Sequence, residues 1–229
     1  LHRDRERRAV ELVGPGVVRA AEEAADVAGG VGDEGAVVAG AVDGEIDEAG
    51  GGDGGEFRAR VIAHKQHRTV ALGEHVTLIF EDELTIRYQV QEMLRIERTF
   101  EEQGIQDELD AYNPLIPDGN NFKATMMIEY PDPAERAQML AKLKGIEDRV
   151  WVQAEGCRRV YAIADEDLER ENDTKTSAVH FLRFSLDDET CKSLKYGVSL
   201  SMGVDHPEYS ASLATVAAPV RAALVKDLL

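Results

Sequence analysis

The sequence has only two cysteines, Cys157 and Cys191, among its 229 residues, and they lie far apart outside any CxxC motif. Iron–sulfur clusters are held by sets of cysteine thiolates, so we expect no iron–sulfur cluster in this chain. Two isolated thiols do not build a disulfide framework, and free cysteines in a reducing compartment are the default state. These observations favour a cytoplasmic protein.

Long apolar runs are also missing, and basic residues are scarce. No run approaches the roughly 18 apolar residues that a bilayer-spanning helix needs, and the N terminus lacks the compact apolar stretch of a signal peptide. The 26 Lys and Arg residues against 44 Asp and Glu give a formal net charge of −18. Because such a charge repels phosphate backbones and anionic lipids, we expect neither nucleic acid nor a membrane surface as partner.

Residues 1–55 use a reduced alphabet that contains no aromatic residue, Lys, Ser or Thr, and they hold 13 of the 20 glycines. A segment with so little to bury cannot offset the entropy lost on ordering, so it is predicted to be a low-complexity disordered tail. Its residues are mostly those of GC-rich codons, which also suggests translation upstream of the true start or in a shifted frame. Gly30–Gly35 matches GxGxxG but lacks the preceding strand and following helix of a dinucleotide site.

Residues 56–229 use a normal alphabet and are predicted to form a single α+β domain. Helical periodicity predicts an amphipathic helix over Glu83–Gln103 that ends at Gly104, and alternation predicts strands at Phe122–Tyr130 and Thr176–Phe184. Hairpin signals recur without a repeated βαβ pattern. We therefore expect a mainly antiparallel sheet with helices packed on one face.

Polar residues interrupt the apolar face of the helix predicted over Glu83–Gln103. At 100° per residue, Gln89 and Glu97 fall within the apolar arc, Glu92 lies at its edge and Arg87 lies opposite. A carboxylate on a core-facing stripe is unfavourable unless it is paired or protonated. A cation, a metal, backbone amides or solvent in a cleft would each satisfy Glu97, and a different helix phase would remove the problem.

His180 is a second polar residue among apolar neighbours, in the strand Thr176–Phe184. A lone histidine there is either a hydrogen-bonded core residue or one member of a site. If the covering helix carries Glu97 toward it, the two groups form a site suited to proton chemistry or to a divalent metal. The histidines His64 and His67 offer another pair of metal ligands on one helix face, or simply a cationic helix end.

Several stretches resemble the bacterial family of unknown function numbered 3501, and the resemblance extends over about residues 56–229. The stretches are Arg68–Gly73, Arg87–Arg98, Tyr112–Pro117, Met127–Glu129 and Thr176–Phe184. The resemblance implies no established activity. It implies a link to rubrerythrin-like and iron–sulfur reductase systems, and so to redox or peroxide-defence work. Members of this family begin with a short ordered segment, from which residues 1–55 depart.

Three functions are compatible with these observations. The first is an accessory redox or metal-handling protein, with Glu97 and His180 and also Gln89 or Glu92 forming a polar site that could hold a divalent metal. The second is a non-catalytic adaptor for a redox protein. The third is an enzyme that acts on a small organic substrate held by Arg87 or Arg183.

Overall fold

The computed structural model describes residues 53–98, 101–164 and 175–229. Almost all of the predicted tail, residues 1–52, lies outside the described residues, whereas residues 53–55 already belong to the first described helix, α2 (Asp53–Gln66). The predicted disorder of the tail and its predicted origin therefore stay predictions.

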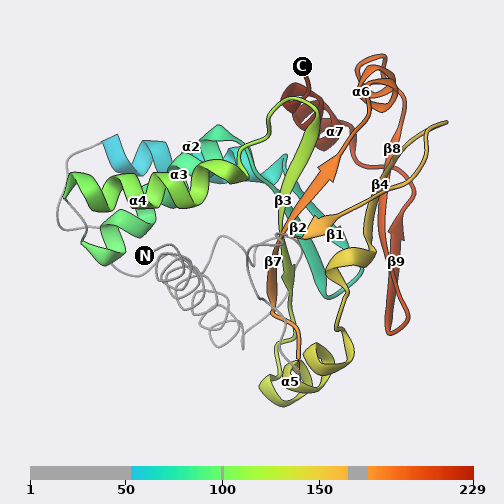
Figure 1. The fold of residues 1–229 in the computed structure, drawn as a ribbon, viewed down its shortest axis with the longest axis horizontal. Helices are drawn as coiled ribbons and strands as arrows, with labels where there is room; N and C mark the ends of the chain where they lie inside the picture. Colours follow the sequence, from blue (N-terminus) through green and yellow to red (C-terminus); the bar gives the residue numbers. More distant parts are fainter. Residues whose placement is uncertain (1–52, 99–100, 165–174) are drawn as a thin grey trace.

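Two antiparallel sheets form the centre of the described structure (Figure 1). The five-stranded sheet has the order β1-β2-β3-β7-β6, and the four-stranded sheet has the order β5-β4-β8-β9. The strands of the first are β1 (Thr69–Leu72), β2 (Val76–Phe80), β3 (Asn121–Ile128), β7 (Val179–Ser185) and β6 (Ile163–Ala164). Those of the second are β5 (Val160–Tyr161), β4 (Val150–Ala154), β8 (Leu200–His206) and β9 (Tyr209–Leu213).

The main core fills the space between the two sheets. Inward-facing residues alternate along each strand, as in β3, where Phe122, Ala124, Met126 and Ile128 are all nearly or fully buried. One chain segment closes one side of this sandwich, because β5 pairs with β4 and β6, two residues later, pairs with β7. At the other side β1 contacts both β8 and β9.

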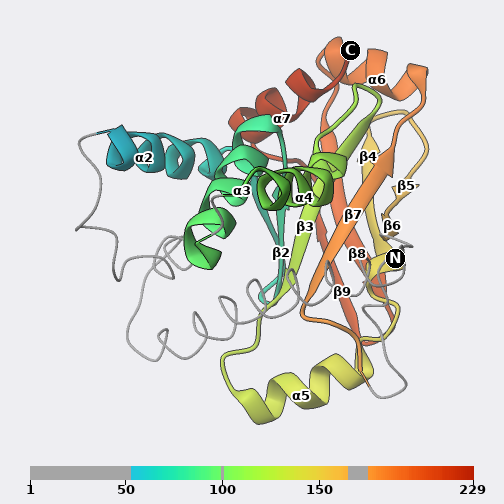
Figure 2. The ribbon, with the colours of Figure 1, turned by 60° about the vertical axis from the view of Figure 1, so that its left-hand side comes forward.

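The helices lie outside the sheets in three places (Figures 1 and 2). Together α2, α3 (Glu83–Glu97) and α4 (Glu102–Tyr112) form an arm that projects from the five-stranded sheet. One end of the strands carries α5 (Pro133–Lys142), and the other end carries α6 (Asp188–Lys195) and α7 (Ala218–Leu224), which continues into the short helix η4 (Val225–Asp227). The short helices η2 (Asn113–Leu115) and η3 (Glu147–Arg149) complete the described elements.

The α+β class and the antiparallel pairing confirm the prediction, and the architecture adds a second sheet. One sheet was expected because each strand signal is local, and the sequence does not show that the residues between β5 and β6 carry the chain from one sheet to the other. The helices accordingly occupy the ends of the sandwich as well as one face.

A small second core joins the arm to the five-stranded sheet. Ile86, Val90 and Met93 of α3 pack with Tyr112 and with Phe181 of β7. Phe181 lies on the opposite face of β7 from His180, Leu182 and Phe184, because successive strand residues alternate. The arm therefore covers the face of β7 that points away from the second sheet.

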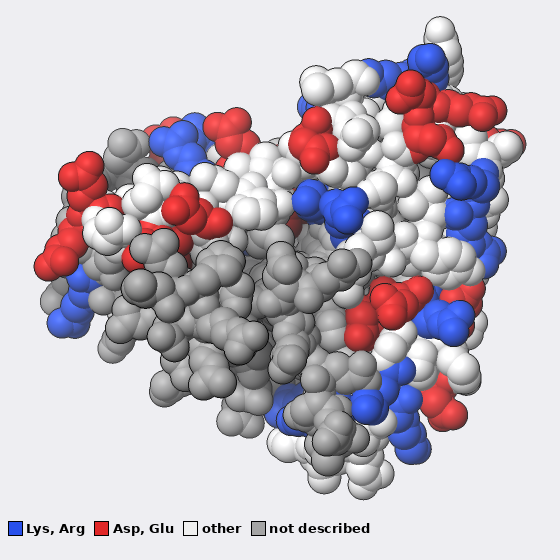
Figure 3. All heavy atoms as spheres, viewed as in Figure 1, with Lys and Arg blue, Asp and Glu red and all other residues white. Residues whose placement is uncertain are grey.

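Charged side chains of both signs cover the face shown in Figure 3. Acidic side chains gather over the outer end of the arm and beside α6, and basic ones follow the edge of the second sheet. Among the described helices, none combines the length and the apolar character that crossing a bilayer requires.

Candidate functional site

A buried arginine, Arg68, lies at the turn between α2 and β1, where three distant segments of the chain meet. The residue is 1% exposed, and its side chain donates from Nε to the carbonyl of Phe80 at 2.8 Å and from Nη2 to the carbonyl of Glu81 at 2.9 Å. It also donates to the carboxylate of Asp227 in η4, and its Nη1 lies 3.3 Å from Oδ2 of Asp82. Arg68 thus fixes two carboxylates with one guanidinium, whose planar fork suits such shared contacts.

Asp82 is the N-cap of α3 and the most heavily bonded of these carboxylates. Its Oδ1 accepts the backbone N–H of Thr85 at 3.0 Å, and the Thr85 hydroxyl oxygen accepts the backbone N–H of Asp82 in return. Burial alone would raise the pKa of Asp82, but the Thr85 amide, Arg68 and His64 outweigh it, so its pKa lies below the ordinary value. Asp82 is therefore a carboxylate held in its ionised form.

His64, in the last turn of α2, pairs with Asp82 through Nε2, which lies 2.5 Å from Oδ2. A carboxylate only accepts hydrogen bonds, so Nε2 carries the proton in this contact and Nδ1 is the nitrogen left for another partner. No described residue bonds Nδ1, and the side chain is 32% exposed. A partly exposed histidine that a carboxylate orients through one nitrogen is the arrangement of a general base.

The second carboxylate, Asp227, has the opposite electrostatic character. Burial raises its pKa, and the neighbouring charge of Asp82 adds to the effect, while Arg68 acts against it. Behind the cluster, Glu81 accepts the hydroxyl of Thr85 at 2.5 Å and that of Thr125 at 2.6 Å. These bonds tie the start of α3 to β3, so the position of Asp82 is set by the sheet.

A surface pocket of about 260 Å³ adjoins this cluster at the start of α3, lined by Asp82, Glu83, Leu84 and Arg87. Asp82 belongs to both the cluster and the pocket. A molecule in the pocket would therefore lie beside the carboxylate that orients His64. The cluster and the pocket together are the candidate functional site.

The comparisons with known proteins place the whole domain in a family. The family described as "Protein of unknown function (DUF3501)" matches residues 54–228. The chain belongs to the DUF3501 family. A solved structure, described as a novel protein of unknown function from Burkholderia pseudomallei, is 56% identical to it, with a TM-score of 0.72 over 76% of this chain and 90% of that one. No curated protein matches the chain.

The helix residues predicted for the site of this DUF3501 domain lie in different surroundings. Arg87 lines the pocket, Gln89 is half-buried, and Glu92 forms an exposed ion pair with Arg95 at 3.1 Å. Glu97 is the last residue of α3, and its side chain lies outside the described residues. The predicted contact between Glu97 and His180 therefore stays a prediction.

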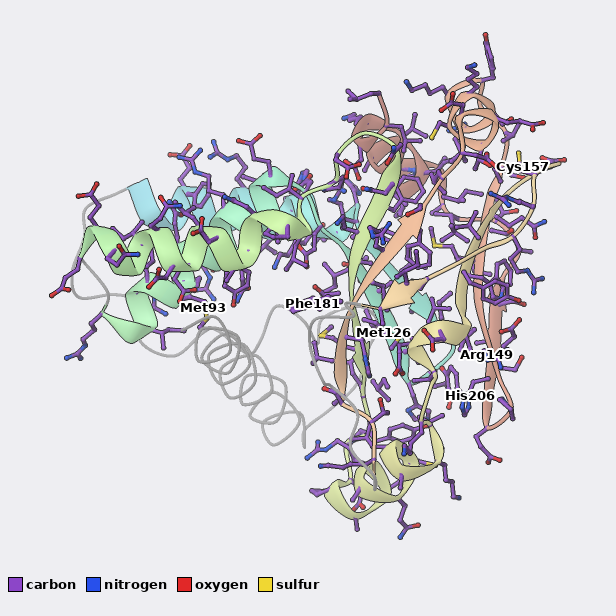
Figure 4. The ribbon with its side chains drawn as sticks, viewed as in Figure 1. Met93, Met126, Arg149, Cys157, Phe181 and His206 are labelled. Atoms are coloured by element: carbon purple, nitrogen blue, oxygen red, sulfur yellow. The ribbon has the colours of Figure 1, made fainter. Side chains whose placement is uncertain are left out.

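His180 of the DUF3501 domain is a hydrogen-bonded residue between the two sheets. It is 1% exposed, and its Nε2 lies 3.0 Å from both the Thr176 hydroxyl and the Ser177 carbonyl. The carboxylate of Glu147 lies nearby, with its Oε2 3.9 Å from Nε2. His180 shares the inter-sheet face with Met126, whereas Met93 of α3 packs on the outer face with Phe181 (Figure 4).

The two histidines predicted as a metal pair on α2, His64 and His67, have different surroundings. His64 bonds Asp82, while His67 is exposed, and His75 stacks on Tyr130 with ring centroids 4.0 Å apart. Among the residues described, no three His, Cys, Asp or Glu side chains gather in a way that could hold a metal ion.

Sequence reasoning missed Arg68, Asp82 and Asp227 as members of one cluster. One local signal existed: an Asp before Glu83 with Thr three positions later is a recognisable helix N-cap. Nothing in the sequence shows that residue 227 returns to residue 68, because that contact depends on the path of the whole chain.

Proposed function

We propose that this DUF3501 domain binds a small organic molecule at the start of α3 and performs acid–base chemistry on it. The observation that carries the proposal is the His64–Asp82 pair at 2.5 Å beside a pocket that Asp82 lines together with Arg87. It corresponds to the third function considered from the sequence, an enzyme that holds a small organic substrate with Arg87 or Arg183, and it uses Arg87.

Each residue of the site has a distinct part in this proposal. Arg87 offers a guanidinium to an anionic group of the substrate, such as a carboxylate or phosphate. His64 accepts or returns a proton at Nδ1. Asp82 holds the ring and stabilises the imidazolium that forms, and Arg68 keeps Asp82 ionised without touching the substrate.

A ligand screen with variants tests this function. Small carboxylates and phosphates are titrated into ¹⁵N-labelled protein, and we expect amide shifts at residues 82–87 that disappear in Arg87→Gln. The exposed Asp107→Asn in α4 is the matched control, because its side chain bonds only Gln103 in the described part of the chain. Binding that is equal in Arg87→Gln and Asp107→Asn would contradict the proposed pocket.

A turnover assay then tests the proton chemistry. Each ligand that binds is incubated with wild type and with His64→Gln, which keeps a similar size without a titratable nitrogen. We expect conversion of the ligand by wild type alone, with the same affinity in both proteins. Equal conversion by His64→Gln would remove His64 from the proposal.

The resemblance noted from the sequence supports a second proposal, an accessory role in redox or metal handling or as an adaptor for a redox protein. His64 and Asp82 are residue types that bind divalent metals, and they lie in contact. Elemental analysis of the purified protein tests this role. A divalent metal bound in a fixed ratio and lost in His64→Gln would support it.

A further inference from the structure

The pocket at the start of α3 holds two opposite charges that do not neutralise each other. Glu83 and Arg87 are four residues apart on one helix face, and both line the pocket. A Glu four residues before an Arg is the favourable order for a helix ion pair. Within the described residues neither side chain forms an ion pair, whereas Glu92 and Arg95 on the same helix do.

The third charged group of the pocket is already occupied. Asp82 accepts hydrogen bonds from His64 and from the Thr85 amide, and it lies in ion-pair contact with Arg68. Its oxygens are therefore already engaged by groups of the protein. The groups left to meet a ligand are the carboxylate of Glu83, the guanidinium of Arg87 and the apolar side chain of Leu84.

From this charge pattern we propose that the ligand is a small zwitterion, such as an amino acid, whose ammonium binds Glu83 and whose carboxylate binds Arg87. The pocket volume of about 260 Å³ exceeds that of several water molecules at about 30 Å³ each, so a small amino acid would fit into it. A purely anionic ligand would face Glu83 with a like charge, and a purely cationic one would face Arg87. This inference rests on the proposed function and names its substrate class.

Three probes of the same carbon chain test the charge requirement: 4-aminobutanoate, butanoate and butylamine. The protein is titrated with each while the amides of Glu83 and Arg87 are followed by NMR. We expect the zwitterion to bind at least about tenfold more tightly than either singly charged analogue, because one charge-assisted hydrogen bond is lost in each. The twenty common amino acids, titrated in the same way, show which spacing of the charges fits best.

Variants assign each charge to its residue. In Glu83→Gln we expect the preference for the zwitterion over butanoate to disappear, and in Arg87→Gln the preference over butylamine. Both residues are exposed, so the variants should fold as wild type does. Asp107→Asn again serves as the control and should keep both preferences.

The outcomes that refute a zwitterionic ligand can be told apart from those that refute the proposed function. If butanoate binds wild type as tightly as 4-aminobutanoate, and binding still depends on Arg87, the ligand is an anion: the zwitterion is refuted and the proposed function stands. If none of the amino acids or three probes shifts the amides of residues 82–87, the zwitterion is refuted, while the carboxylate and phosphate screen separately decides the proposed function.

Discussion

At the scale of single residues, Arg68 is the side chain on which the site depends most. It is enclosed with two carboxylates, Asp82 and Asp227, whose side chains are 19% and 8% exposed. A buried ion pair adds little net stability, but removing one partner leaves a buried charge without compensation. Arg68 therefore contributes to the stability of the fold mainly because its loss would leave two carboxylates unpaired.

This asymmetry gives a first prediction. Arg68→Met should lower the free energy of unfolding by about 3–5 kcal/mol, whereas Asp227→Asn, which keeps an oxygen that accepts from Arg68, should cost clearly less. Urea unfolding at neutral pH measures both values. A larger loss in Asp227→Asn than in Arg68→Met would show that Arg68 is not the common partner.

Asp82 gives a pH-dependent prediction. Its folded pKa lies below the ordinary 3.8, so its ionised form stabilises the fold above pH 3.8, and that stabilisation is lost as pH falls below 3.8 through the folded pKa. Asp82→Asn should thus be less stable than wild type at pH 6, by about 1–3 kcal/mol for a charge-assisted bond. The difference should shrink as pH falls below 3.8.

Urea unfolding of both proteins across this pH range checks the effect. Asp118→Asn is a suitable control, because Asp118 lies on the surface and bonds the side chain of Asn121 outside the cluster. A difference between wild type and Asp82→Asn that stays constant down to the lowest pH would contradict the assignment.

The sequence allowed the types of the important residues to be predicted better than their partners. His180 was correctly expected to be buried in a covered strand, and Thr176 and Ser177 satisfy it. Arg87, expected opposite the apolar arc of α3, is exposed and lines the pocket. The Arg68–Asp227 contact spans 159 positions, and local patterns carry no information about such a pair.

At the scale of elements, α3 ends earlier than its hydrophobic pattern suggests. The helix was predicted to continue to Gln103, but it ends at Glu97 with Arg98 in the left-handed region at φ 53°, and α4 begins at Glu102 and includes Gly104. Ile96, an apolar residue near the end of α3, is 62% exposed. Periodicity reports where a helix is amphipathic, whereas tertiary packing decides where it ends.

Arg98 provides a test of this helix end. A left-handed conformation costs roughly 1–2 kcal/mol for a residue with a Cβ and is the usual place for glycine after a helix. We expect Arg98→Gly to raise the free energy of unfolding by about 0.5–1 kcal/mol and Arg98→Val to lower it, as thermal unfolding would show. A stabilising Arg98→Val would mean that the left-handed helix end is not formed.

At the scale of the whole molecule, polar contacts add to the apolar core that holds the two sheets together. Within the four-stranded sheet, an added Cβ at Gly203 would lie 2.5 Å from Trp151 Cζ2 and 2.7 Å from the Ala211 carbonyl, so the Trp ring lies directly over the strand. Such contacts fix how the strands fit within a sheet. The fit of one sheet to the other depends on side chains that cross between them.

Tyr209 is the side chain that joins the sheets at the β1–β9 edge. Its hydroxyl donates to the carbonyl of Leu72 at 2.6 Å and accepts the backbone N–H of His75 at 3.1 Å. It thus links β9 of one sheet to both ends of the turn between β1 and β2 of the other. The glycine within that turn, Gly73, has φ 77°, a conformation that glycine adopts readily.

Tyr209→Phe should remove both bonds while it keeps the aromatic ring in the core. Because the site is partly exposed, water can replace part of the loss, and we expect a decrease of about 1–2 kcal/mol in the free energy of unfolding. Amide hydrogen exchange locates the effect: the His75 amide should exchange faster by more than the global change explains, since it loses its acceptor. The Leu78 amide, in the middle of β2, should change only with global stability. If both amides accelerate equally, Tyr209 contributes to general packing and the hydroxyl does not hold the two sheets together.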